Sequence, residues 1–318
     1  MKVKSVYILS DFRGWILEAI AQESAATLNS NIKIIYIPTK LKDLLRVSEL
    51  FDLIRYRNQN ELTLFINQAT YFRVLKSKFF RSKPENSRVY YTHKAIGIND
   101  VDEAKKLSQV EKILTNNAFD MNRLIHLEVN RNKVQVIYGA VDRNTYFPTK
   151  KFLKKSAALP YTIIVGNCKE RKNPRLVYEV IKRMNKMQFI IHGNGWKDYF
   201  YKNDLTTFEN LKILDFDKNR NPELMRNAHV YLSLANLEGG PYTTLEALAS
   251  GTPVVATDTG FNSDFLNSSN GVLLPIDVDV FQVEQAINQA FALKEKIGHL
   301  DLLFGNFTWS QLAYKLYN

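Results

Sequence analysis

Residues 236–260, NLEGGPYTTLEALASGTPVVATDTG, decide the fold class of this chain. The apolar run HVYLSLA precedes them, a Gly-Gly-Pro turn follows, and the next residues have the pattern of a helix that Gly251 ends. The run TPVVATD then has the β-branched composition of a strand. A strand, a helix and a strand in succession are typical of a parallel α/β sheet.

The same alternation runs along the whole chain and predicts an α/β protein with two doubly wound, Rossmann-like domains. In the first half we expect strands at residues 5–10, 32–37, 62–66, 88–92, 112–115 and 134–138, and helices at 14–28, 41–56, 71–82, 101–107 and 119–127. We place an N-terminal domain at residues 1–155, a C-terminal domain at 156–300 and a last, aromatic-rich helix at 301–318. The basic, proline-bounded segment 148–160 is the expected hinge.

Charge is distributed unevenly along the 318 residues, whose formal net charge is +11. Residues 1–159 contain 27 Lys and Arg against 15 Asp and Glu, whereas the remainder contains 16 against 17. The excess predicts an anionic partner for the first half: a membrane surface, a phosphorylated acceptor or a nucleic acid. A nucleic acid is the weakest of the three because no nucleic-acid motif accompanies the charge. Cys168 is the single cysteine, which excludes an internal disulfide and favours a cytoplasmic location. The basic first half extends this expectation to a peripheral position at the inner face of the membrane.

The opening stretch also has the chemistry of a ligand site. Gly239 and Gly240 allow close approach of the backbone, and the first amides of the helix after Pro241 favour an anion such as a diphosphate. A carboxylate beside a phosphate repels it, so Glu238 and Glu246 are expected to accept hydrogen bonds from sugar hydroxyls. For an isolated pair at this spacing, a helix cap and a solvated side chain would be the expected alternative.

Two further strand ends contribute candidate residues. In VGNCKERKNP, Arg171 and Lys172 follow a strand and suit phosphate oxygens, although solvated loop charges are the alternative. In HGNGW, Gly193 suits close backbone approach to a nucleotide base.

Taken together, residues 130–318 resemble the retaining nucleotide-sugar glycosyltransferases of the GT-B fold, family 4, also called glycosyl transferases group 1. The stretch above is similar to the family pattern E-G-x-P-x-x-x-x-E-A-x-A-x-G-x-P-V-V, and NGVLLP continues the match. VIYGAVDRNTYFP and IIVGNCKERKNP resemble the segments that end the family's first domain and begin its second. FTWSQLAYKLYN resembles its closing helix, which crosses back to the first domain.

The resemblance implies two domains facing a cleft, and a role for each matching residue. Glu238 would contact the transferred sugar as a catalytic residue, Glu246 would bind the nucleotide ribose, and Lys172 would bind phosphate. Asn167 replaces the family's phosphate arginine, which leaves Arg171 as a substitute. The other donor-binding residues implied by the match are Gly166, Gly193, Gly239, Gly240, Pro241, Tyr242 and Thr243.

In the first half the resemblance is confined to two strand ends. DFRGW occupies the place of the family's first loop, with Arg13, Gly14 and Trp15 as expected acceptor contacts. VYYTHKAIG resembles the strand end that carries a histidine, here His93, expected to bond the donor sugar as a second catalytic residue. An incidental structural histidine is the alternative.

The implied function is transfer of a sugar from a nucleoside-diphosphate sugar to an acceptor hydroxyl with retention, in cell-surface polysaccharide or glycolipid assembly. No acidic cluster has metal spacing, so we expect neither a metal nor any other obligatory cofactor. The alternatives are a phosphorylase or epimerase, and a non-catalytic nucleotide-sugar-binding subunit. The segment YFRVLKSKFFRSK predicts a basic and aromatic helix, with Phe72, Phe79 and Phe80 on a lipid-facing side. A core-facing helix is the alternative.

Overall fold

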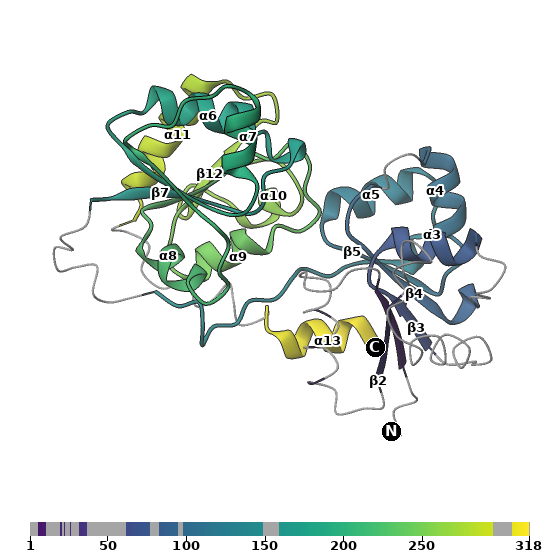
Figure 1. The fold of residues 1–318 in the computed structure, drawn as a ribbon. Helices are drawn as coiled ribbons and strands as arrows, with labels where there is room; N and C mark the ends of the chain where they lie inside the picture. The colour runs from purple at the N-terminus through teal and green to yellow at the C-terminus, as the bar shows by residue number, and fades with distance from the viewer. Residues whose placement is uncertain are drawn as a thin grey trace. The chain divides into compact units, whose positions relative to one another are not determined.

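The computed structural model describes residues 6–10, 20, 22, 26, 32–36, 62–76, 83–94, 98–148, 159–294 and 307–317. The chain divides into two compact units, one of residues 1–138 with 309–318 and one of residues 139–308. Figure 1 shows a parallel sheet with helices on both faces in each unit. The α/β class and the two doubly wound sheets predicted from the sequence are therefore confirmed.

The sheet of the first unit is parallel and has the order β2-β1-β3-β4-β5-β6. Its strands are β1 (Val6–Ser10), β2 (Ile32–Tyr36), β3 (Leu62–Phe65), β4 (Ser87–Tyr91), β5 (Lys112–Thr115) and β6 (Val134–Val136). The helices whose bounds the structure describes in this unit are α3 (Gln68–Lys76), α4 (Asp100–Leu107), α5 (Ala118–His126) and α13 (Trp309–Tyr317). Asn99 and Asn117 cap α4 and α5 by accepting from backbone amides, which explains where these helices begin.

Side chains of β4 alternate between the two faces of the first sheet. Val89 and Tyr91 pack into the core beneath α3, α4 and α5, which Figure 1 shows together on one side. On the other face the buried guanidinium of Arg88 donates from Nη1 to the carbonyl of Leu316 at 3.2 Å, and from Nη2 to Glu111 at 2.8 Å. The closing helix α13 thus belongs to the first unit, as the resemblance implies.

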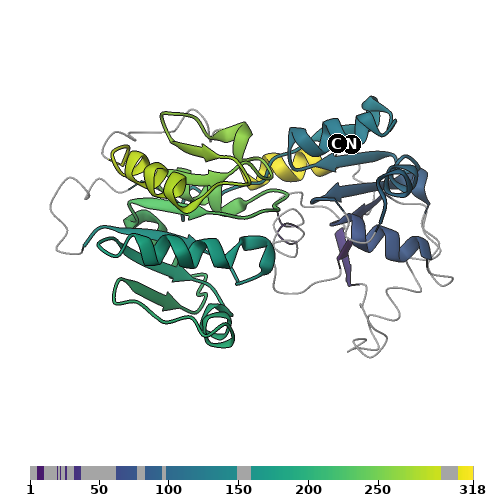
Figure 2. The same ribbon diagram turned by 90° about the horizontal axis from the view of Figure 1, so that it is seen from above.

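The sheet of the second unit is also parallel and has the order β12-β11-β10-β7-β8-β9. Its strands are β7 (Tyr161–Val165), β8 (Gln188–His192), β9 (Leu211–Leu214), β10 (Val230–Ser233), β11 (Val254–Thr257) and β12 (Gly271–Leu274). Its helices are α6 (Pro174–Arg183), α7 (Trp196–Lys202), α8 (Asn221–Asn227), α9 (Tyr242–Ala249), α10 (Asn262–Phe265) and α11 (Val280–Phe291). Figures 1 and 2 both show α6 and α11 side by side over one face, and their apolar sides share one core with α7.

The boundary between the units differs from the predicted one at residue 155. Residues 139–148 belong to the second unit, because the amide of Val141 donates to the carbonyl of Phe307 and Asn221 donates to the hydroxyl of Tyr146. No sequence pattern reveals such contacts, since the partners are far away along the chain. Most of the expected hinge, residues 149–158, lies outside the described residues.

One side chain of the predicted lipid-facing helix is placed in the core. Helix α3 begins at Gln68, earlier than expected, and Phe72 is 4% exposed beside Tyr71. The expectation that Phe72 faces lipid is therefore wrong: it faces the core. Phe79 and Phe80 lie outside the described residues. Among the helices described, none has the length and hydropathy needed to cross a membrane.

We expect Leu316→Ala to lower the free energy of unfolding of the first unit by about 2–4 kcal/mol, because the side chain of Leu316 is fully buried and its removal leaves a cavity. Urea denaturation measures this change. Lys315→Ala, on the exposed side of α13, is the matched control and should change stability by less than about 0.5 kcal/mol. Equal effects of the two substitutions would contradict the packing of α13 described here.

Candidate functional site at the switch point of the second sheet

The order of the second sheet creates a topological switch point between β7 and β10. From β7 the chain proceeds to β8 on one side, and from β10 it proceeds to β11 on the other. In open α/β sheets, ligands bind beyond the carboxyl ends of the strands at such a point. The loops that leave this edge are residues 166–173 after β7 and residues 234–241 after β10, which contain most of the donor-binding residues predicted from the sequence.

The two loops are joined by charge and by backbone hydrogen bonds. Glu238 forms an ion pair with Arg171, whose Nη1 lies 2.7 Å from Oε1, and a second ion pair with Lys172. Arg171 also donates to the carbonyl of Leu237 at 3.0 Å, and its own carbonyl accepts from the amide of Asn236 at 2.8 Å. The structure therefore brings the predicted sugar carboxylate and the two predicted phosphate cations to one point.

Two opposing effects act on the Glu238 carboxyl group. Its side chain is 10% exposed, and burial by itself would raise its pKa. The positive charges of Lys172 and Arg171 outweigh this effect and hold the pKa of Glu238 below its usual value. Glu238 is therefore ionised at neutral pH and balances one of the two neighbouring positive charges.

The turn before α9 is shaped by a glycine that the sequence analysis missed. Gly260 has φ +60°, and a Cβ there would lie 2.8 Å from the carbonyl oxygen of Gly239 and 2.8 Å from Cδ of Pro241. The signal was visible in ATDTG, where a glycine ends the segment that follows a strand. Pro241 occupies the N-cap position of α9, and the amide of Thr244 donates to the carbonyl of Pro241. One of the first helix amides expected to hold an anion is thus used within the helix.

Gly193 allows two strand ends to pack closely. The sequence analysis had proposed instead that it allows a nucleotide base to approach the backbone. A Cβ at Gly193 would lie 2.0 Å from the carbonyl oxygen of Gly166, so the two strand ends pass each other too closely for any side chain. That carbonyl also accepts from Nε1 of Trp196 at 2.8 Å. Asn167, at the family's arginine position, accepts from the amide of Asn194 at 3.1 Å. These residues join the loops after β7 and β8.

Glu246 lies at the end of a buried polar network. Nδ2 of Asn221 donates to Oε2 of Glu246 at 3.3 Å and to the hydroxyl of Tyr146 at 3.0 Å, and Oδ1 of Asn221 lies 3.0 Å from Nδ1 of His192. Burial raises the pKa of Glu246 to about 7, and hydrogen bonds from Tyr146 and Asn221 limit the rise. The sequence analysis missed Tyr146 and Asn221, because hydrogen bonds between distant residues leave no local pattern.

The remaining members of the predicted site are less closely tied to these groups. The ring of Tyr242 packs over Gly139, where a Cβ would lie 2.7 Å from Cζ of the tyrosine. Gly240 and Thr243 lie beside it at the start of α9. Arg13, Gly14 and Trp15 lie outside the described residues.

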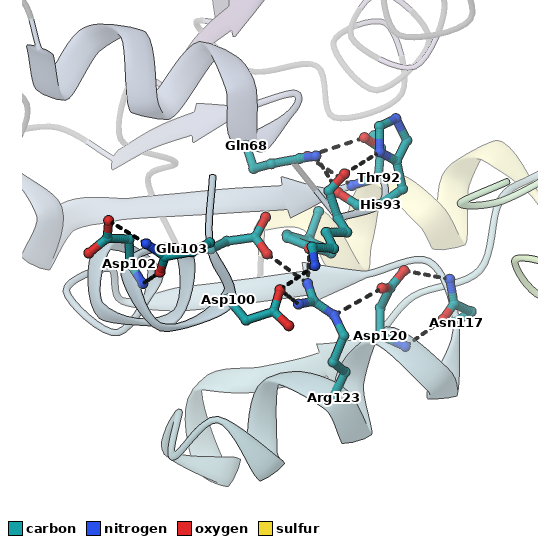
Figure 3. Close-up of polar contacts among 12 residues, drawn as sticks. Gln68, Thr92, His93, Asp100, Asp102, Glu103, Asn117, Asp120 and Arg123 are labelled. Atoms are coloured by element: carbon teal, nitrogen blue, oxygen red, sulfur yellow. Dashed lines mark hydrogen bonds and ion pairs between the residues drawn. The ribbon is translucent and has the colours of Figure 1, made fainter. Parts of the chain in front are cut away.

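His93 lies in the first unit, at the carboxyl end of β4. Its Nδ1 lies 2.8 Å from the carbonyl oxygen of Lys94, which can only accept, so Nδ1 carries the proton and Nε2 of the neutral ring has a lone pair. Gln68 donates to the carbonyl of His93 and accepts from the amide of Thr92 at 3.1 Å (Figure 3). These bonds fix the backbone that carries the imidazole.

A charged cluster lies on the same edge of the first sheet. Figure 3 shows Arg123 among the carboxylates of Asp100, Glu103 and Asp120, and its Nη2 donates to the fully buried Glu103 at 2.7 Å. Burial raises the pKa of Asp120 above its usual value, against the effects of its hydrogen bond from Asn117 and of the charge of Arg123. Within the described part of the chain, no group of three or more His, Cys, Asp or Glu side chains could hold a metal ion.

We expect Glu246→Gln to raise the melting temperature more at pH 8 than at pH 5.5. The folded pKa of about 7 exceeds the unfolded value of about 4.3, so the folded state binds the extra proton between these values. The contribution of Glu246 to stability therefore falls as pH rises towards 7, by about 4 kcal/mol at most. Calorimetry of both proteins, with the exposed Glu209→Gln as control, measures the difference. A difference that does not change with pH would contradict the assigned titration.

Comparisons with known proteins agree with this geometry. Residues 148–299 match the family model described as glycosyl transferases group 1. Over 232 residues, 64% of this chain, the sequence is 25% identical to the GtfA subunit of a UDP-N-acetylglucosamine–peptide N-acetylglucosaminyltransferase from Streptococcus pneumoniae serotype 4. The match covers 45% of that relative, so the chain spans less than half of its length.

Solved structures with the same fold cover nearly the whole chain. HepE from Anabaena, solved in complex with UDP-glucose, has a TM-score of 0.73 at 13% identity over 98% of each chain. Sucrose-phosphate synthase from Thermosynechococcus elongatus has a TM-score of 0.72 at 13% identity, over 99% of this chain and 97% of its own. Identities this low show the fold alone. The protein therefore has the GT-B fold of two Rossmann-like units, and its residues 148–299 carry the sequence pattern of the glycosyl transferases group 1.

Proposed function

We propose that the chain is a retaining glycosyltransferase of family 4 that moves a sugar from a nucleoside-diphosphate sugar to an acceptor hydroxyl. The observation that carries the proposal is the contact of Glu238 with Lys172 and Arg171 at the switch point of the second sheet. A carboxylate that accepts from sugar hydroxyls and two cations that bind phosphate match the two halves of such a donor. The relatives named above, solved with UDP-glucose or named for UDP-N-acetylglucosamine, support the donor class.

In the proposed reaction, the bond from the anomeric carbon to the diphosphate breaks and a bond to the acceptor oxygen forms on the same face. The leaving diphosphate takes up the proton that the acceptor hydroxyl gives up. Lys172 and Arg171 would stabilise the negative charge that develops on the leaving diphosphate. Glu238 would hold the sugar, and Glu246 the ribose of the nucleotide. Since the two cations supply positive charge without a metal, we propose that no metal is obligatory. The role of His93 towards the donor sugar stays a prediction.

The acceptor and the location are proposed on charge alone. The excess of Lys and Arg in residues 1–159 supports an anionic, lipid-linked acceptor at the inner face of a membrane, as in polysaccharide or glycolipid assembly. Phe72 does not contribute to such a surface, because it lies in the core.

A second candidate is a nucleotide-sugar-binding subunit without transfer activity of its own. The observation that favours it is the relative from Streptococcus pneumoniae, which is named as a subunit. The two candidates differ in one respect that can be measured: only the enzyme transfers sugar when it is the sole protein present.

We expect Glu238→Ala to lower transfer by roughly a hundredfold or more, while nucleoside diphosphate affinity is kept or rises, because the carboxylate no longer competes with the diphosphate for the two cations. The carboxylate contacts sugar in the proposal, and its removal leaves Lys172 and Arg171 in place for the diphosphate. Transfer is measured with a radiolabelled donor and affinity by calorimetry. Glu170→Ala, an exposed glutamate on the same loop, is the control. Unchanged turnover in Glu238→Ala would refute the assigned role.

We also expect nucleoside diphosphates to raise the melting temperature of the chain, by several degrees at about 100 times the dissociation constant. A panel of UDP, ADP and GDP with their sugar conjugates identifies base and sugar. Lys172→Ala should remove most of the shift, whereas Lys169→Ala, an exposed lysine on the same loop, should keep it. A panel in which no nucleotide changes the melting temperature would overturn both candidate functions.

A further inference from the structure

A directed chain of hydrogen bonds leads from the end of β9 to Glu246. The amide of Asp217 donates to Nε2 of His192 at 2.9 Å, so the neutral imidazole carries its proton on Nδ1. That proton faces Oδ1 of Asn221 at 3.0 Å. The backbone amide of Asp217 thus determines which tautomer His192 adopts.

The tautomer of His192 in turn fixes the side-chain amide of Asn221. When Oδ1 of Asn221 accepts from the imidazole of His192, the two Nδ2 protons point to the hydroxyl of Tyr146 at 3.0 Å and to Oε2 of Glu246 at 3.3 Å. A flipped amide would set two donors against each other at His192 and two acceptors against each other at Glu246. His192 is fully buried and Asn221 is 2% exposed, so water cannot relieve that conflict.

Tyr146 supplies the second donor to the carboxylate. Its hydroxyl accepts from Asn221, which leaves its own proton for Glu246. Burial, together with the charge of Glu246, raises the pKa of Tyr146, so the hydroxyl keeps this proton at neutral pH. The other ionisable groups that act on Glu246 or on this network are Asp142, His192, Lys218 and Tyr231.

The donors named so far do not use the full acceptor capacity of the Glu246 carboxylate. A carboxylate can accept about four hydrogen bonds, and Asn221 and Tyr146 supply two donors. The remaining lone pairs suit two adjacent hydroxyl groups, the arrangement found in a ribose with free 2′ and 3′ oxygens. A 2′-deoxyribose would leave one of these positions without a donor, which is costly at a buried acceptor.

We propose that Asn221 and Tyr146 are positioning residues that hold the Glu246 carboxylate in one orientation and thereby make the site selective for ribonucleoside over deoxyribonucleoside diphosphates. This inference rests on the proposed function, in which Glu246 receives the ribose. It adds the residues that orient the carboxylate and the substrate class that the orientation selects. Neither residue contacts the sugar itself in this scheme.

The test measures by calorimetry the affinities of the wild type and its variants for UDP, ADP and GDP and for their 2′-deoxy forms. We expect the wild type to prefer the ribonucleotide by roughly tenfold. Tyr146→Phe and Asn221→Asp should reduce that preference to about threefold or less, with little change in affinity for the deoxynucleotide. Asn221→Asp keeps an acceptor for His192, but it places a second carboxyl group beside Glu246 and so raises the pKa of the pair. Tyr146→Phe, which removes a donor without adding charge, is therefore the deciding variant.

The matched control is Tyr161→Phe. The hydroxyl of Tyr161 donates to the carbonyl of Leu224 at 2.7 Å in the same unit and makes no bond to Glu246, so its loss costs a comparable buried hydrogen bond. This variant should keep the full ribonucleotide preference. An unchanged preference in Tyr146→Phe, or an equal loss in Tyr161→Phe, would overturn the inference while leaving the proposed function intact.

A pH series separates positioning from a merely structural effect. Affinity for the ribonucleotide should rise with pH as Glu246 ionises near pH 7, and Tyr146→Phe should move that rise to higher pH, because the ionised carboxylate loses a donor. Glu246→Gln lacks the titrating carboxyl group, so its affinity at each pH shows the part of the pH dependence that comes from the nucleotide phosphates. If the midpoint does not move in Tyr146→Phe, the positioning role is wrong. If the wild type binds none of the six nucleotides, the proposed function fails and this inference fails with it.

Discussion

The attraction between Glu238 and the cations Lys172 and Arg171 is the contact on which the candidate site depends. It joins the loop after β7 to the loop after β10, two segments more than sixty residues apart that become neighbours only because these strands are adjacent in the sheet. Reversal of the strand order at this point opens the sheet edge, and the ion pairs bring the loops on either side of it together. A buried carboxylate without such partners would take up a proton, so the two cations keep Glu238 ionised.

This arrangement has a consequence for ligand binding. One carboxylate opposes two cations, so the group retains net positive charge at a sheet edge where helix amides also point. A diphosphate would compete with Glu238 for the cations, and the carboxylate released from them would become an acceptor for hydroxyl groups. The bonds between the cations and Glu238 would be replaced by bonds between the cations and the diphosphate, and between Glu238 and hydroxyl groups. The partly buried charges would therefore keep partners throughout.

The polar networks around Arg123 and around Glu246 differ in how much hydrogen-bonding capacity they leave for a ligand. Around Arg123 in the first unit, the carboxylates of Asp100, Glu103 and Asp120 surround one guanidinium, and the arrangement stabilises the edge that carries His93. Around Glu246 in the second unit, Asn221 and Tyr146 supply two donors to a carboxylate that can accept about four hydrogen bonds. Acceptor capacity that remains in such a network can recognise a ligand.

The sequence by itself determined the α/β class, the positions of the described strands and the identity of Glu238, Lys172 and Arg171 as charged groups at strand ends, because periodicity and turn residues are local properties. It did not determine that Gly193 is required by Gly166, that Gly260 makes room for the turn at Gly239, or that Phe72 faces the core. Nor did it reveal Asn221 and Tyr146 beside Glu246, or assign residues 139–148 to the second unit. Only the tertiary structure decided these features. Each depends on a contact between residues that are distant in the sequence and become neighbours when the sheet packs.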